Sequence, residues 1–209
     1  MKLYLKIFLF LISIIIFNNC VNTKGFVKQK NNSEIIVKPL LQEDYSTALY
    51  KSKIDLGDKH FSGLFYFKSL ADSSYRIVFL SEFGLNLLDM EYKNHKFEVK
   101  NIQDFLNKKI IINTLQRDLK LLIDIPNKNK YKTYKSSVNQ ITLVKYSKIF
   151  KKYYYFYSEN KDLIKIIHRN GLSLINIEAK YSDKKVPQEM EIENKRIKLK
   201  IKFNLIKLK

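Results

Sequence analysis

The chain has 209 residues, a formal net charge of +19 at pH 7 and one cysteine. The length is enough for one domain with a sizeable core, and a single cysteine excludes a fold held together by internal disulfides. The positive charge alone would fit nucleic acid or an anionic membrane. However, the chain is rich in Lys, Asn, Ile, Tyr and Phe together, which is the composition that AT-rich codons produce. We therefore expect no nucleic-acid partner and favour contact with anionic lipid headgroups.

The N-terminus has the pattern of an export signal. Lys2 and Lys6 precede an apolar run at 7–17 that is interrupted only by Ser13. These roughly eleven residues match the core of a signal peptide, whereas a membrane-spanning helix needs about 20 apolar residues. The single cysteine, Cys20, follows almost directly. Structural cysteines of exported proteins are normally paired, so this thiol needs another explanation.

The segment IIIFNNC, which ends at Cys20, resembles the lipobox of bacterial lipoproteins. In a lipobox a diacylglycerol is joined to the cysteine through a thioether, the signal peptide is cut before it, and the new amino terminus is acylated with palmitate. Phe17 and Asn19 stand where a lipobox usually has leucine and a small residue. The resemblance implies a signal peptide at 1–19 and lipidation of Cys20. An uncleaved anchor and an ordinary signal peptide cut nearby are the alternatives.

The rest of the chain divides into a tether and one domain. Residues 20–42 comprise the lipidated cysteine and a polar stretch without clear periodicity, which is typical of a linker. Strand patterns become dense after this stretch. We therefore expect a single domain at 43–209.

Apolar runs bounded by turn residues predict antiparallel strands in the first half of that domain. These runs cover 61–70, 75–80, 85–92 and 96–100. One longer helix is predicted at 109–124, where apolar residues recur at helical spacing and Pro126 follows, and a shorter helical turn at 102–106. The polar residues of the longer helix are expected on its outer sides: Arg117, Asp118 and Lys120.

Two hairpins are predicted in the second half. In the first, Asn170-Gly171 suits a type I′ turn and would place Ile167 opposite Leu174.

In the last hairpin a turn at Asn194-Lys195 would align acidic with basic residues on one face and apolar residues on the other, with Met190 opposite Leu199. This pattern predicts a curved antiparallel sheet with one wet face and one buried face.

Residues that carry catalytic or metal chemistry are sparse. The histidines, at positions 60, 95 and 168, have no second histidine or cysteine at ligand spacing, and His168 is expected to form a surface pair with Ser173. No G-x-S-x-G or H-E-x-x-H motif is present. Three carboxylates on predicted strands are expected to be solvated: Glu82, Asp89 and Glu91. We therefore expect no enzyme activity, no metal site and no cofactor.

A run of basic and aromatic residues, KKYYYFY at 151–157, could in another setting stack single-stranded bases. Aromatic residues also favour strands. A core or lipid-facing strand is the preferred interpretation.

The order of these features resembles the bacterial lipoprotein-carrier superfamily, which includes the periplasmic carrier LolA and its membrane-anchored outer-membrane receptor LolB. Small lipoproteins of this kind are similar in three segments: FSGLFYFKSL at 61–70, SYRIVFLSEFGLNLLDMEY at 74–92 and IINTLQRDL at 111–119. The resemblance covers 43–208. It implies a mainly β fold with covering helices (α+β), in which a curved antiparallel sheet forms an unclosed half-barrel.

In this family the half-barrel encloses an apolar cavity that takes the acyl chains of a client lipoprotein. The resemblance implies that apolar residues on the concave side could bind acyl chains here. The candidates are Phe65, Phe67, Ile77, Phe79, Leu85, Leu87, Ile111, Leu115 and Leu119. Burying methylene groups is favourable without any polar partner, but the same residues could also simply fill a core.

Two functions follow from this sequence. The first is a lipid-anchored, monomeric lipoprotein on the periplasmic side of the outer membrane, which binds acyl lipid or client lipoproteins in lipoprotein transport. The alternative is a structural or accessory outer-membrane lipoprotein with a filled core, which binds a protein or membrane partner. An open apolar groove would favour the first function and a filled interior the second. Val21 is not the aspartate that can retain a lipoprotein in the inner membrane, which favours the outer membrane.

Overall fold

The computed structural model describes residues 23–29, 37–41, 45–126, 131–182 and 186–209. The predicted signal peptide and Cys20 lie outside the described residues. Within the part of the chain that is described, no helix is both long and apolar enough to cross a membrane.

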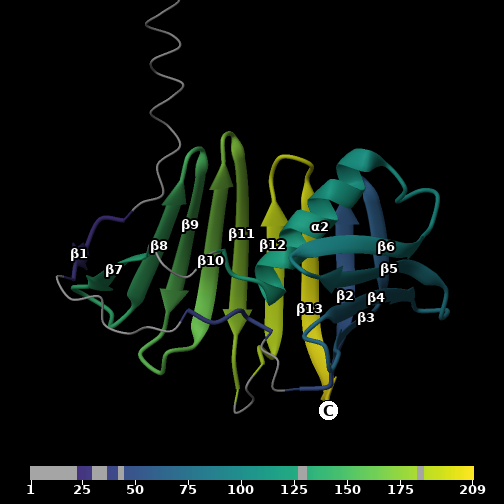
Figure 1. Cartoon of the computed structure of the whole chain (residues 1–209), viewed down its shortest axis with the longest axis horizontal. Helices are drawn as coiled ribbons and strands as arrows, with labels where there is room; N and C mark the ends of the chain where they lie inside the picture. Colours follow the sequence, from purple (N-terminus) through teal and green to yellow (C-terminus); the bar gives the residue numbers. More distant parts are fainter. Residues whose placement is uncertain (1–22, 30–36, 42–44, 127–130, 183–185) are drawn as a thin grey trace, which may run out of the picture.

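One antiparallel sheet of thirteen strands dominates the fold (Figure 1), so the expected mainly β, unclosed antiparallel sheet is confirmed. The strands follow one another in the sheet as β1-β7-β8-β9-β10-β11-β12-β13-β2-β3-β4-β5-β6. Their bounds are β1 Phe26–Lys28, β2 Thr47–Leu56, β3 Lys59–Ser69, β4 Tyr75–Ser81, β5 Asn86–Lys93, β6 Lys96–Ile102, β7 Tyr131–Ser136, β8 Thr142–Lys148, β9 Lys151–Tyr157, β10 Leu163–Asn170, β11 Ser173–Lys180, β12 Glu189–Asn194 and β13 Leu199–Leu208. The described residues contain one helix, α2, at Lys109–Ile123.

The strands alternate between buried and exposed side chains, as expected for a sheet with one wet face. In β3, Phe65 and Phe67 are fully buried, while the residues between and beside them are partly exposed. The same alternation runs through β13, where Ile201 and Phe203 are buried. The period-two pattern therefore decides which face of the sheet meets the core.

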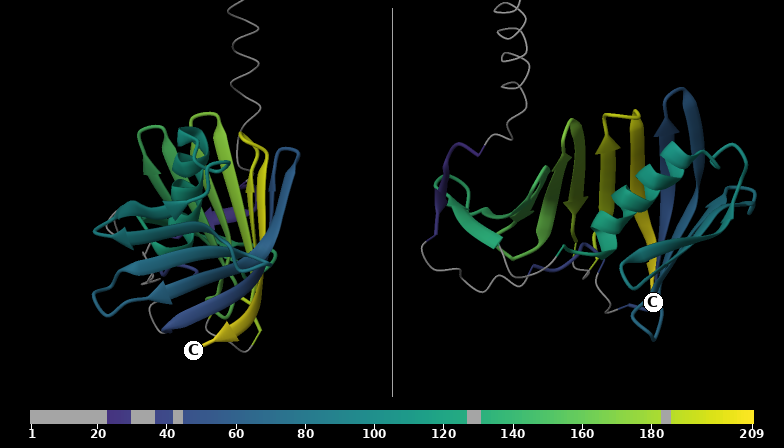
Figure 2. Two further views of the ribbon diagram at one scale, coloured as in Figure 1. Left: turned by 90° about the vertical axis from the view of Figure 1, so that its right-hand side faces the viewer. Right: turned by 45° about the horizontal axis from the view of Figure 1, so that its top comes forward.

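Helix α2 lies on the buried, concave side of the sheet. Figure 1 shows it crossing in front of β12 and β13, and Figure 2 shows the β4–β6 end of the sheet curling toward the same side. Its apolar stripe, which includes Leu115, Leu119 and Leu122, is buried against the sheet. Helix and curled sheet together enclose the core.

The segment expected to be a tether at 20–42 contributes to the fold instead. Phe26–Lys28 forms the edge strand β1, which pairs with β7, and the Phe26 ring meets the Phe156 ring edge-on at 6.0 Å. Further along, Leu40 and Leu41 are fully buried, and the Leu41 N–H donates to the Leu122 carbonyl of α2 at 2.9 Å. The residues that make these contacts are single apolar residues within a polar stretch. Such a stretch has no hydrophobic periodicity, so the sequence pattern did not predict that it packs on the domain.

The hairpin of β10 and β11 differs from its predicted register. The turn consists of Gly171 and Leu172, and His168 pairs with Ile175. Gly171 takes a φ of 56° at the first central position, where a type II′ turn requires glycine. The predicted type I′ turn is therefore wrong, and so is the predicted pairing of Ile167 with Leu174, because the turn begins one residue later than expected.

The last hairpin keeps its two faces but not its predicted register. Met190 pairs with Phe203 rather than with Leu199, because the turn spans 195–198. Asn194 closes this longer turn, since its side-chain oxygen accepts the Arg196 N–H at 3.2 Å. The opposite charges still align, and Glu191 forms an ion pair with Lys200 at 2.7 Å.

The segment at 102–106 was expected to contain a helical turn, and a single such turn follows β6, since the Asn107 N–H donates to the Gln103 carbonyl four residues earlier at 3.1 Å. Ile102 ends β6, and a hydrogen-bonded turn follows in which the Leu106 N–H donates to the Gln103 carbonyl at 2.9 Å. This turn leads the chain from the sheet edge to the start of α2.

Candidate functional site

The predicted acyl-chain residues lie mostly in one buried cluster. Seven of them are buried in the main core: Phe65, Phe67, Ile77, Phe79, Leu87, Leu115 and Leu119. Ile111 packs partly buried against that core. Leu85 is in the turn between β4 and β5, 63% exposed, and the structure does not bring it to the others.

The core around these residues is filled. Phe65 stacks on Phe79 with ring centroids 4.6 Å apart and meets Phe203 at 5.2 Å. The space left between Phe79, Leu115 and their neighbours is about 10 Å³, at the lower limit of the roughly 10–15 Å³ that a cavity needs to hold one water molecule. Of the two possibilities that the sequence left open for these residues, the packed aromatic rings favour a filled core over an open cavity.

A larger open pocket lies elsewhere on the concave side. It has a volume of about 1090 Å³ and lies between the second half of α2, the β5–β6 turn and the strands β9 and β10; we call it the helix pocket. Its lining residues are His95, Phe97, Asn113, Gln116, Arg117, Lys120, Leu121, Asp124, Ile125, Pro126, Lys151, Tyr153, His168 and Asn170. Drug-sized ligand sites in proteins measure about 300–1,000 Å³, so this pocket is large enough for a ligand.

The helix pocket combines an apolar wall with positive charge. Phe97, Leu121 and Tyr153 supply the wall. The cations come from Arg117, Lys120 and Lys151, of which Lys151 at the start of β9 is exposed. Such a lining suits a ligand that has both an apolar part and an anionic group.

One carboxylate, Asp124, is already engaged inside the pocket. It accepts hydrogen bonds from the Tyr92 hydroxyl and from His95 at 3.0 Å, and its ion pair with Lys120 measures 3.3 Å. Burial alone would raise the pKa of Asp124, but the hydrogen bonds from Tyr92 and His95 and the charge of Lys120 together lower it. Asp124 therefore stays ionised at neutral pH and holds the β5–β6 turn to the end of α2.

His168 is buried rather than on the surface, contrary to the predicted surface pair with Ser173. It is 2% exposed, and its ring stacks on Tyr153 with centroids 4.2 Å apart. Burial, assisted by the charges of Arg117 and Lys151, lowers the pKa of His168 to about 4. The imidazole is therefore neutral at pH 7, and neither ring nitrogen has a hydrogen-bond partner within the described residues.

Asp118 was expected on an outer side of the helix, and that prediction is wrong. It is fully buried beneath the pocket, where it accepts a hydrogen bond from the Asn194 amide at 2.7 Å and pairs with Arg117 at 3.0 Å. Burial raises the pKa of Asp118, against the opposing effect of Asn194 and Arg117. Its position one residue before Leu119, within the apolar stripe, was the signal that could have revealed it.

The basic and aromatic run at 151–157 forms β9 and is a core strand. Tyr154, Tyr155 and Tyr157 are buried, and Tyr153 lines the helix pocket. Burial raises the pKa of Tyr157 and that of Tyr155. Because these rings are buried, the strand offers no stack of exposed rings to a nucleic acid.

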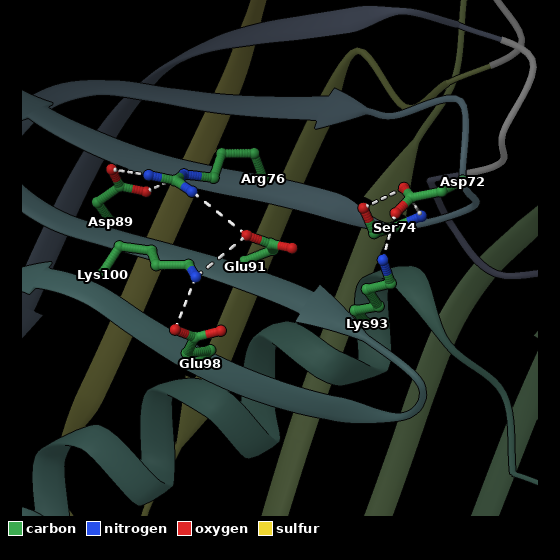
Figure 3. Close-up of polar contacts among 8 residues, drawn as sticks. All are labelled: Asp72, Ser74, Arg76, Asp89, Glu91, Lys93, Glu98 and Lys100. Atoms are coloured by element: carbon green, nitrogen blue, oxygen red, sulfur yellow. Dashed lines mark hydrogen bonds and ion pairs between the residues drawn. The ribbon is translucent and has the colours of Figure 1, made fainter.

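Of the three carboxylates expected to be solvated, Glu82 is exposed just after β4, whereas Asp89 and Glu91 are mostly covered by ion pairs on the far side of the sheet from the pocket. In Figure 3, Arg76 of β4 holds Asp89 with two contacts of 2.5 and 2.7 Å and reaches Glu91 at 3.4 Å. Lys100 of β6 lies 2.6 Å from Glu98 and 3.5 Å from Glu91. This network connects β4, β5 and β6 across their solvent face.

Another ion pair joins the end of β5 to the turn between β3 and β4. Lys93 lies 2.7 Å from Asp72, which also accepts the Ser74 hydroxyl at 2.5 Å (Figure 3). The hydrogen bonds from Lys93 and Ser74 lower the pKa of Asp72. Both groups are about half exposed, so the pair contributes little to stability in water.

No protein-family model matches the chain, and no curated protein matches it significantly. Among the described residues, no group of three or more His, Cys, Asp or Glu side chains is arranged to hold a metal ion. The helix pocket is therefore the candidate site on its geometry alone.

Proposed function

We propose that the protein is a lipid-anchored lipoprotein of the outer membrane whose half-barrel binds an anionic amphiphile, either an acyl lipid or the acylated end of a client lipoprotein. The sequence supports the anchor through Cys20 and the apolar run before it. The unclosed sheet with one helix on its concave face agrees with the lipoprotein-carrier resemblance at the level of architecture.

The observation that carries the ligand class is the lining of the helix pocket. Its apolar wall of Phe97, Leu121 and Tyr153 could shelter an acyl chain, and Lys151 and Arg117 could meet a phosphate or carboxylate. Charged residues that face one ligand group in a partly enclosed site interact more strongly than they do in open water. The proposed ligand site is therefore the helix pocket and not the aromatic core.

The accessory function remains the second candidate, because one observation favours it. The aromatic core around the candidate acyl-chain residues is packed, with about 10 Å³ left beside Phe79. A protein with a filled core would bind its protein or membrane partner through its surface, as the accessory function requires.

Charge reversal at Lys151 tests the ligand. We expect the Lys151→Glu variant to bind lysophosphatidylglycerol, offered below its micellar concentration, about tenfold more weakly than the unaltered chain, a difference of about 1.4 kcal/mol. Isothermal titration calorimetry measures the affinities. The matched control is Lys132→Glu, which makes the same charge change at an exposed position of β7 outside the pocket lining.

A bulky substitution tests whether the ligand occupies the helix pocket, independently of the charge at Lys151. Gln116→Trp would fill the pocket from the middle of α2, and Lys109→Trp would add the same ring outside its lining. If the protein purifies gently without bound lipid and neither Lys151→Glu nor Gln116→Trp changes binding, the ligand proposal is wrong and the accessory function is favoured.

Replacing Cys20 tests the anchor separately. We expect Cys20→Ala to release the protein from the membrane fraction into the soluble periplasmic fraction, because the proposed acyl chains would have no attachment point. Fractionation followed by immunoblotting measures the distribution, with Ser33→Ala as the control substitution. Incorporation of labelled palmitate that persists unchanged in Cys20→Ala would contradict lipidation at this position, and membrane contacts elsewhere in the chain do not affect that readout.

A further inference from the structure

One end of the sheet gathers three successive hairpin turns. These are the turns of β8–β9, β10–β11 and β12–β13, which lie along one edge in Figure 1 because their strands are consecutive in the sheet. The first two turns are joined directly, since the Gly171 N–H donates to the Phe150 carbonyl at 3.1 Å. We call the residues 149–150 and 171–172 the apolar tip.

The apolar tip exposes large side chains to solvent. Ile149, Phe150 and Leu172 are 80%, 81% and 90% exposed. Phe150 has a φ of 61°, in the left-handed region that glycine or asparagine usually occupies in turns. A bulky apolar residue in that conformation is costly for a turn whose only role is to connect two strands.

Positive charge surrounds the tip. Lys148, Lys151 and Lys152 flank the first turn, and the neighbouring β12–β13 turn adds the exposed cations Lys195 and Arg196. The sequence has no Asp or Glu at 148–152, 169–172 or 195–198. Exposed apolar side chains beside unopposed cations complement a surface that presents negative charge above an apolar layer.

We propose that the apolar tip inserts into the headgroup region of an anionic phospholipid membrane, with the surrounding lysines bound to lipid phosphates. Phe150 and Leu172 enter the boundary between headgroups and acyl chains, a region that accepts isolated apolar side chains. This contact is separate from the helix pocket and from any lipid on Cys20. The tip would fix which end of the sheet faces the membrane.

The absence of tryptophan from the chain makes a local test possible. In the full chain, Leu172→Trp introduces a single indole at the tip, and Val138→Trp introduces one at an 89% exposed position in the β7–β8 turn, at the other end of the sheet. Both variants are reconstituted into vesicles of phosphatidylcholine with phosphatidylglycerol, and into phosphatidylcholine alone. Some of the phosphatidylcholine carries brominated acyl chains, which quench a nearby indole.

In the anionic vesicles we expect Leu172→Trp fluorescence to shift to the blue and to be quenched at least twofold more than that of Val138→Trp. Adding Lys148→Glu and Lys152→Glu to Leu172→Trp should remove most of this difference. Because the reporter is local, an anchor elsewhere in the chain does not produce the result. Equal emission from the two tryptophan variants overturns the proposal, and equal quenching in neutral and anionic vesicles overturns its electrostatic part.

Discussion

Replacing Phe65 with alanine is expected to lower the free energy of unfolding by about 3–5 kcal/mol. Phe65 is fully buried, stacks on Phe79 and meets Phe203 edge-on. Its removal loses the transfer free energy of the ring and also leaves a cavity, because β3 is held between two neighbouring strands and cannot collapse around it. The loss is among the largest that a single side chain of this core can produce.

Urea unfolding followed by circular dichroism measures this loss as a change in midpoint at constant slope. The control is Phe83→Ala, the same substitution at a residue that is 92% exposed, where the change should stay within about 0.5 kcal/mol. A loss below about 1 kcal/mol for Phe65→Ala would show that the core is looser than its packed rings indicate. It would also reopen the core as an acyl-chain site.

Gly63→Ala is expected to destabilise the protein by about 3 kcal/mol, although it adds only one methyl group. A Cβ at Gly63 would overlap the carbonyl oxygen of Leu80 and lie 2.9 Å from the carbonyl carbon. Both atoms belong to the backbone of β4, which pairs with β3 at this point, so no side-chain rotation can relieve the overlap. The two strands would have to separate locally and lose ladder hydrogen bonds.

The same unfolding experiment tests this prediction, with Gly57→Ala as the control. Gly57 has open space around its Cα but a φ of 60°, so alanine there meets only backbone strain, with an expected cost of about 1 kcal/mol. A Gly63→Ala loss no larger than that of Gly57→Ala would mean that β3 and β4 can move apart at little cost.

The sequence was a good guide to faces and a poor guide to registers. Alternation in β12 and β13 predicted which residues share a face, because the side-chain period of a strand is two. The pairing of those residues depends on the number of residues in the turn, and local chemistry decides that number. Asn194 closes a longer turn than expected, and Gly171 begins its turn rather than ending it.

The candidate site could be predicted only in part. Burial of Phe65 or Leu115 followed from the apolar pattern, but whether buried side chains fill a space or surround it depends on three-dimensional packing. The helix pocket joins Lys120 of α2 to Lys151 and His168 of the second half of the sheet. No local pattern links residues so far apart, and the buried Asp118 was hidden because a polar residue within an apolar stripe was read as an outward one.

The edge strand β1 has a consequence for how far the domain can travel. A chain of n residues spans at most about 3.3–3.6 Å for each residue. If Cys20 carries the lipid, Phe26 follows it after only five intervening residues, a reach of about 20 Å, whereas a tether that ran to residue 43 would reach on the order of 80 Å. If Cys20 is the point of attachment, the three-residue pairing with β7 thus shortens the free linker and keeps the domain close to the membrane that holds the lipid.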